Sequence, residues 1–187
     1  MKITCFIGVI GSGKDYQANK LVQEGYQQVN FADELYVQIG KILNLDLSSR
    51  AAREHFKKYY PNARIILQNY GQLRRKEDPE YWVKKFNNKL EEAKKNKFNL
   101  IVCSDVRQLN EVKFCLSLKN EIEDLRNGIY HFWYDIDFIF CNYISERYDA
   151  NNKNISEKLA QRILKDGYKN NDKINHEYLE ELIKNGV

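Results

Sequence analysis

Long apolar runs are absent from this sequence. None of its hydrophobic stretches approaches the roughly 20 residues that span a bilayer. After residues 1–4 a glycine-rich loop begins too soon to leave room for the apolar segment of a secretory signal. We therefore expect a cytoplasmic protein without a membrane partner.

The sequence also lacks the cysteine and histidine patterns of metal sites. Its four cysteines show no CxxC spacing, and each lies in an apolar stretch. The three histidines, His55, His131 and His176, have no partners at the spacing of a zinc site or a catalytic triad. We expect buried free thiols rather than disulfides or metal ligands.

A strong excess of one charge is missing as well. The 30 basic and 26 acidic residues are interspersed and give a net charge of +4, so we do not expect nucleic acid as a partner. With 43% hydrophobic residues, the 187-residue chain can form a sizeable core, and we expect one domain over 1–187. The oligomeric state stays open, with a homodimer as one alternative.

What the sequence does contain is an alternation of short apolar segments and helical patterns. Helices are predicted after Asp33, which we expect to act as a cap, over 65–75, and from Asp78 onward. Strands separated by helices predict an α/β fold with three layers, α/β/α, and a mainly parallel sheet. The strands are predicted at 2–7, 29–31, 98–103 and 138–141, with a brief one near 173–174, while most of 119–137 is left undecided.

The clearest motif follows the first predicted strand. Gly8-Val9-Ile10-Gly11-Ser12-Gly13-Lys14 fits the phosphate-binding pattern G-x-x-x-x-G-K and precedes a predicted helix. Glycines let backbone N–H groups approach phosphate oxygens, the helix start adds a favourable dipole, and Lys14 can bridge the terminal phosphates. We predict that Gly8, Gly11, Ser12, Gly13, Lys14 and Asp15 bind the phosphates of a nucleotide.

Asp15 stands where the pattern usually has a Ser or Thr whose hydroxyl binds magnesium. A carboxylate there can hold the metal directly or through water, or it can simply cap the helix; both alternatives stay open. Asp105 ends a predicted apolar strand, the usual place for a metal-orienting carboxylate, and a strand-end cap is its alternative.

Four other charged or amide residues are candidates for binding the phosphates or the acceptor. Arg107 could reach the same phosphates or form a surface ion pair, and Glu111 could orient Arg107 or cap the next helix. Arg64 and Gln68 are four residues apart and share a helix face, so they could meet the phosphate and base of one mononucleotide, although surface Arg and Gln are ordinary.

Several motifs together resemble the phage-type deoxynucleoside monophosphate kinases. The matching segments span most of the chain and occur in the family's order. They are the loop ending in Gly13-Lys14-Asp15, Phe31-Ala32-Asp33, Arg64-x-x-x-Gln68-x-x-Gly71, Tyr81-Trp82-Val83, Asp105-Val106-Arg107 with Asn110-Glu111, and Ile155-Ser156-Glu157.

This resemblance implies a P-loop NTPase fold of the nucleoside-monophosphate-kinase type, with ATP and Mg²⁺ as cofactors and a deoxynucleoside monophosphate as acceptor. It implies catalytic roles for Lys14 and Arg107, acceptor contacts for Asp33, Arg64, Gln68 and Glu111, and metal binding by Asp15 and Asp105. It also implies an acceptor-binding helical lobe at about 33–76.

Phosphoryl transfer also requires a lid that excludes water. We expect the lid at about 144–156, with Arg147 as its arginine, and a surface loop is the alternative.

Two alternatives to this function remain. Animal phosphomevalonate kinases share the GKD loop, a stretch like Gly71 to Pro79, and a strand ending in S-D-x-R. A module that binds ATP without transferring its phosphate is the other alternative.

Overall fold

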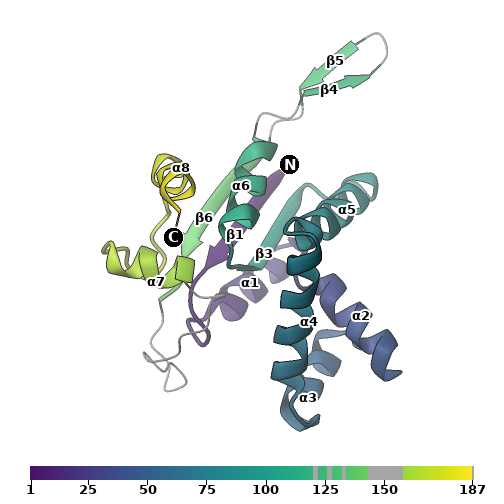
Figure 1. Ribbon diagram of the computed structural model, residues 1–187. Helices are drawn as coiled ribbons and strands as arrows, with labels where there is room; N and C mark the ends of the chain where they lie inside the picture. The colour runs from purple at the N-terminus through teal and green to yellow at the C-terminus, as the bar shows by residue number, and fades with distance from the viewer. Residues whose placement is uncertain (120–121, 126–127, 132–133, 143–157, 187) are drawn as a thin grey trace. The chain divides into compact units, whose positions relative to one another are not determined.

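The computed structural model of the chain describes residues 1–119, 122–125, 128–131, 134–142 and 158–186 (Figure 1). The chain divides into two compact units. Unit 1 comprises Met1–Asn30 and Glu92–Val187, and unit 2 comprises Phe31–Glu91. Unit 2 is therefore an insertion in the sequence of unit 1. The lobe expected at 33–76 falls within the sequence of unit 2, and its binding of an acceptor stays a prediction.

Unit 1 contains a four-stranded parallel sheet with the order β2-β3-β1-β6. Its central strands are buried on both faces, which explains why they read as continuous apolar runs. The predicted α/β class with a mainly parallel sheet is thus confirmed. The strands are β1 (Lys2–Ile7), β2 (Gln27–Gln28), β3 (Leu100–Val106) and β6 (Asp135–Phe140).

Helices cover both faces of this sheet. Successive strand residues point to opposite faces, and Phe6 packs with Ala18 of α1 (Lys14–Gln23). The neighbouring Cys5 instead meets Cys115 of α6 (Leu109–Leu118), with the two sulfur atoms 3.9 Å apart. Helix α6 also packs against α8 (His176–Asn185), and α7 (Lys158–Lys165) precedes α8 in the chain. The arrangement is compatible with three α/β/α layers.

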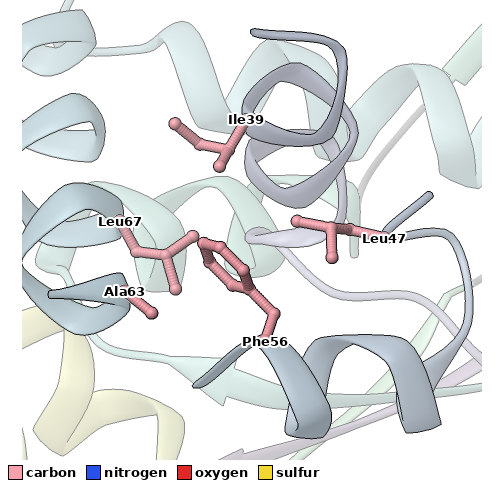
Figure 2. Packing of buried hydrophobic residues seen from close by; sticks show 5 residues of the cluster. All are labelled: Ile39, Leu47, Phe56, Ala63 and Leu67. Carbon is pink, nitrogen blue, oxygen red and sulfur yellow. The ribbon is translucent and has the colours of Figure 1, made fainter. Parts of the chain in front are cut away.

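All regular structure described in unit 2 is helical. It consists of α2 (Asp33–Leu43), α3 (Arg50–Tyr59), α4 (Ala63–Glu77) and the first part of α5 (Tyr81–Lys95), which continues into unit 1. Ser49 starts α3 by accepting a hydrogen bond from the N–H of Ala52. The helices α2, α3 and α4 enclose a core of their own, shown in Figure 2, which comprises Ile39, Leu47, Phe56, Ala63 and Leu67.

Some predicted boundaries are wrong. The strand expected at 29–31 is instead β2 at Gln27–Gln28, and Val29 follows it, donating its N–H to the carbonyl of Val102. The side chain of Asn30 accepts from the backbone N–H of Ser104. Phe31 already belongs to unit 2, where its ring stacks on Phe86 with 3.9 Å between centroids.

The remaining elements resolve what the sequence left open. Strands β4 (Ile122–Leu125) and β5 (Gly128–His131) form an antiparallel hairpin. Near the expected brief strand at 173–174, Lys173 forms one antiparallel bridge with Ile139. In the part of the chain that the structure describes, no helix combines the length and apolar character needed to cross a membrane.

Candidate functional site

The loop between β1 and α1 has a backbone that requires glycine. Gly11 and Gly13 have φ values of 83° and 84°, in the left-handed region that side-chain-bearing residues rarely adopt. At Gly8 the constraint is space: a Cβ there would lie 2.3 Å from the carbonyl oxygen of Cys141 and 2.4 Å from Oγ of Ser12. The glycines of the motif are thus explained by the loop's own geometry.

Lys14 is folded into this loop. Its side chain is largely buried, and Nζ donates to the carbonyl oxygens of Gly8 at 2.7 Å and Val9 at 2.6 Å and to Oγ of Ser12 at 3.3 Å. Gly13 caps α1 without a side-chain hydrogen bond, so the first turn contributes backbone N–H groups and the positive end of the helix dipole. The loop therefore gathers positive potential at the carboxyl end of β1.

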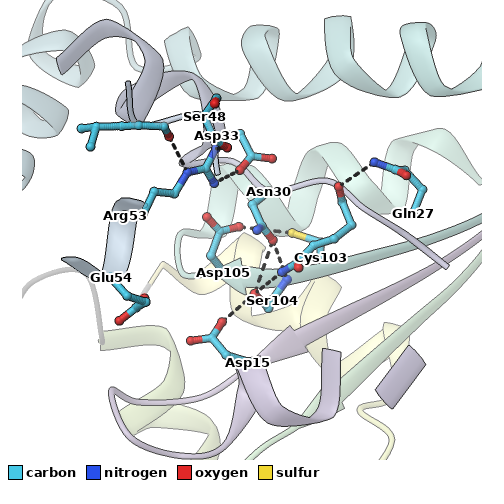
Figure 3. Close-up of polar contacts among 12 residues, drawn as sticks. Asp15, Gln27, Asn30, Asp33, Ser48, Arg53, Glu54, Cys103, Ser104 and Asp105 are labelled. Carbon is cyan, nitrogen blue, oxygen red and sulfur yellow. Dashed lines mark hydrogen bonds and ion pairs between the residues drawn. The ribbon is translucent and has the colours of Figure 1, made fainter. Parts of the chain in front are cut away.

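Asp15, on the first turn of α1, is joined to the end of β3. The hydroxyl of Ser104 donates to Oδ1 of Asp15 at 2.9 Å (Figure 3). The backbone N–H of Ser104 donates to Oδ1 of Asn30 at 2.9 Å, and Nε2 of Gln28 donates to the Ser104 hydroxyl at 3.2 Å. One buried serine thus connects the loop helix with β2 and β3.

Asp105 follows Ser104 directly and is half-buried. The thiol of Cys103 donates to its Oδ1 at 3.3 Å. The structure brings Asp15 and the Ser104–Asp105 segment to the same edge of the sheet, where both predicted metal ligands lie. Among the described residues, no three His, Cys, Asp or Glu side chains gather closely enough to hold a metal ion by themselves.

Arg107 and Glu111 lie just beyond β3. The buried carboxylate of Glu111 accepts from the backbone N–H of Arg107 at 2.7 Å and from that of Gln108 at 3.0 Å. With Gln108 it forms a capping box at the start of α6. The structure therefore shows the capping role that the sequence left open. Contact of Glu111 or Arg107 with a substrate stays a prediction.

The predicted acceptor residues lie in unit 2. Arg64 and Gln68 are both exposed on α4, one turn apart. Asp33 is the first residue of α2 and not its cap, which is Ala32, so the predicted capping role is wrong. Its carboxylate instead pairs with the guanidinium of Arg53 (Figure 3). Binding of an acceptor by Asp33, Arg64 and Gln68 stays a prediction.

Arg53 is a residue that the sequence analysis missed. It donates to the carboxylate of Asp33 and to the carbonyl oxygens of Leu47 at 2.9 Å and Ser48 at 3.2 Å. Its guanidinium also lies over the ring of Tyr36, 4.8 Å from the centroid. These contacts join α3, the segment before it and α2 within unit 2.

Ser104, Asn30 and Gln28 were missed as well. The available signal for Ser104 is the motif S-D-x-R, Ser104 to Arg107, which follows the apolar segment of β3. Arg147 and the expected lid at 144–156 lie outside the described residues.

The four thiols of unit 1 are buried and free. Hydrogen bonds with Cys103 and Cys115, together with burial, raise the pKa of Cys5 well above its ordinary value. Burial raises the pKa of Cys103 to about 12 and that of Cys141 to about 11. A raised pKa keeps the thiols of Cys5, Cys103 and Cys141 protonated at neutral pH, which makes them poor nucleophiles.

Neither a scan against models of protein families nor a search of curated proteins finds a match to this chain.

Proposed function

We propose that the chain is a magnesium-dependent kinase that transfers the γ-phosphoryl group of ATP to a deoxynucleoside monophosphate, forming the diphosphate and ADP. The observation that carries the proposal is the loop from Gly8 to Lys14, in which Gly8 has no room for a Cβ and the lysine is folded against the loop carbonyls. A strand, glycine loop and helix in this order are typical of phosphate binding.

The sheet topology supports a P-loop NTPase fold of the nucleoside-monophosphate-kinase type. In the sheet, β1 and β3 are neighbours in the middle. The chain runs from β1 to β2 at one edge of the sheet, and from β3 to β6 at the opposite edge. The connections thus leave two neighbouring strands in opposite directions, which creates a crevice at their carboxyl ends. The loop follows β1 and Asp105 is near the end of β3, so the candidate residues lie where open α/β sheets bind ligands.

The donor set fits magnesium. Asp15 and Asp105 offer carboxylate oxygens, which magnesium prefers, and two carboxylates suit an ion held mainly by phosphate oxygens and water. When bound, the ion would neutralise charge on the ATP phosphates. Asp15 and Asp105 would hold it in this proposal.

The proposed mechanism uses positioning and charge. The acceptor is itself a phosphate anion, so no nucleophilic side chain is needed. Lys14 would exchange contacts with the loop carbonyls for contacts with phosphate oxygens. Arg107, whose backbone is fixed by Glu111 at the start of α6, would stabilise charge on the transferring group.

The acceptor is assigned to unit 2 in this proposal. Arg64 and Gln68 are exposed one turn apart, which leaves both side chains accessible to a mononucleotide. The resemblance to deoxynucleoside monophosphate kinases supports this assignment. Arg147 is assigned to a lid on a separate ground, that phosphoryl transfer must exclude water.

The deciding experiment measures ADP released from MgATP in the presence of each deoxynucleoside monophosphate, each ribonucleoside monophosphate and phosphomevalonate. We expect release that depends on a deoxynucleotide acceptor. Release that depends on phosphomevalonate, or tight ATP binding without any acceptor-dependent product, would contradict the proposal.

Lys14→Ala is the matching variant, and we expect it to lose turnover by about 100-fold or more because the lost charge acts on the transferring phosphate. Lys20→Ala, on the exposed side of the same helix, is the control and should keep normal turnover. Near-normal transfer by Lys14→Ala would refute the role of the loop.

A further inference from the structure

Ser104 is one of few polar residues buried among those described, with 3% of its surface exposed. Burying a hydroxyl is costly unless it is hydrogen-bonded. Its partner Asp15 is 89 residues away in the sequence and lies on the first turn of α1. The two side chains meet because β3 lies beside β1 and α1 packs on both strands.

The direction of the Ser104 hydroxyl proton follows from its neighbours. The hydroxyl has one proton and two acceptors within reach, Oδ1 of Asp15 at 2.9 Å and Oδ1 of Asn30 at 3.4 Å. The charged and nearer acceptor binds it more strongly. Asn30 already accepts from the backbone N–H of Ser104, and Nε2 of Gln28 donates to the hydroxyl oxygen. The proton therefore points to Asp15.

This bond fixes an otherwise exposed carboxylate. Asp15 is solvent-exposed, and a side chain in that position can adopt several rotamers. Holding Oδ1 against Ser104 selects one of them and leaves Oδ2 as an oxygen donor of defined direction. The position is the one at which phosphate-binding loops usually carry a Ser or Thr hydroxyl. A carboxylate supported by a second residue would replace that hydroxyl.

We propose that Ser104 is a positioning residue, which holds Asp15 in place to bind the magnesium ion that accompanies ATP. The inference rests on the proposed function but adds a residue that the loop pattern does not contain. It predicts that loss of the hydroxyl weakens ATP binding only when magnesium is present.

The test is a magnesium titration of ATP binding, measured by isothermal titration calorimetry for the full chain. We expect Ser104→Ala to weaken binding of MgATP about tenfold, the effect typical of losing a residue that orients a metal ligand. ATP binding in the presence of EDTA should stay unchanged. Ser117→Ala removes an exposed hydroxyl of α6 and is the control, which should match the wild type.

A double-mutant cycle separates positioning from a direct effect. If Ser104 acts through Asp15, then Ser104→Ala should have no further effect in the Asp15→Asn variant. Ser104→Cys keeps most of the side-chain volume with a weaker donor, and it replaces the alanine variant in the cycle if that variant fails to fold. Circular dichroism checks the fold of each variant.

The outcomes are distinct. A wild-type protein with no magnesium-dependent ATP binding overturns the proposed function, and this inference with it. If the wild type binds MgATP, the inference alone is overturned by a Ser104 variant with an unchanged magnesium titration. Full additivity with Asp15→Asn, or an equal loss in EDTA, also overturns it.

Discussion

Alanine substitutions at three buried glycines, Gly8, Gly40 and Gly71, test whether the loop after β1 needs glycine at Gly8 to bind ATP or only to keep the protein stable. At Gly8 the added Cβ would lie 2.3 Å from a backbone oxygen of Cys141, a separation that real Cβ atoms essentially never show. Gly8 and Cys141 directly follow the paired strands β1 and β6, so the backbone must shift to make room. Overpacking of this kind costs about 1–3 kcal/mol, and we expect about 2 kcal/mol for Gly8→Ala.

The two other glycines lie in unit 2 and act as internal controls. A Cβ at Gly40 would lie 2.5 Å from the backbone oxygen of Leu45, so Gly40→Ala should also destabilise by about 2 kcal/mol. A Cβ at Gly71 would meet its nearest atoms at 3.6 and 3.8 Å, which is ordinary contact. Since Gly71 is inside α4, Gly71→Ala should stabilise by about 0.5–1 kcal/mol.

The assays are thermal unfolding and calorimetric ATP binding. For a chain of this length, about 2 kcal/mol corresponds to a decrease of Tm by about 4–8 °C. We expect Gly8→Ala and Gly40→Ala to show similar decreases, but only Gly8→Ala should lose ATP binding while it remains folded. A Gly8→Ala protein with normal Tm and normal ATP affinity would refute both the packing argument and the assignment of the loop.

Three other predictions concern the acceptor, pH and the thiols. Arg64→Ala should weaken binding of the deoxynucleotide acceptor about tenfold and leave ATP affinity unchanged by calorimetry, because a charge-assisted hydrogen bond is worth about 1.5–3 kcal/mol; the opposite pattern would show that the two sites are exchanged. Burial alone would raise the pKa of Asp137, but Lys173 and Lys2 outweigh it and hold this pKa below the ordinary 3.8. The stability that Asp137 contributes is thus present above about pH 4 and is lost as the pH falls through the lowered pKa. Asp137→Asn should therefore reduce the dependence of the free energy of urea unfolding on pH below about pH 4. An equal slope in both proteins would contradict the assignment. The four buried thiols should not react with a disulfide reagent at pH 8 until guanidinium unfolds the protein, and rapid reaction in the native state would contradict their burial.

Local signals explain which parts of the structure could be predicted. The segment from Lys2 to Lys14 contains an apolar strand, three glycines and a helix start in sequence order, so its fold follows from neighbouring residues. The helix at Ala63–Glu77 likewise has a continuous helical pattern around the predicted 65–75.

Long-range contacts explain what could not be predicted. The Ser104–Asp15 bond depends on the pairing of β1 with β3, which no spacing in the sequence reveals. Arg53 resembles any basic residue on an exposed helix until Asp33 and the carbonyl of Leu47 are brought to it. The misplaced strand at 29–31 is a similar case, because Phe31 belongs to unit 2 and its ring stacks on Phe86, which is 55 residues away in the sequence.

The insertion of unit 2 between β2 and β3 has a consequence for the order of folding. The helices of unit 2 that pack together, α2 with α4 and α3 with α4, all lie within residues 33–77, whereas pairing of β1 with β3 must close a loop that contains all of unit 2. Local helical contacts form faster than such distant pairings, and closing a loop costs less entropy when its interior is already compact. During synthesis, every residue of the Ile39–Leu67 core is made before β3. Unit 2 should therefore fold first and bring the two halves of the parallel sheet within reach of each other.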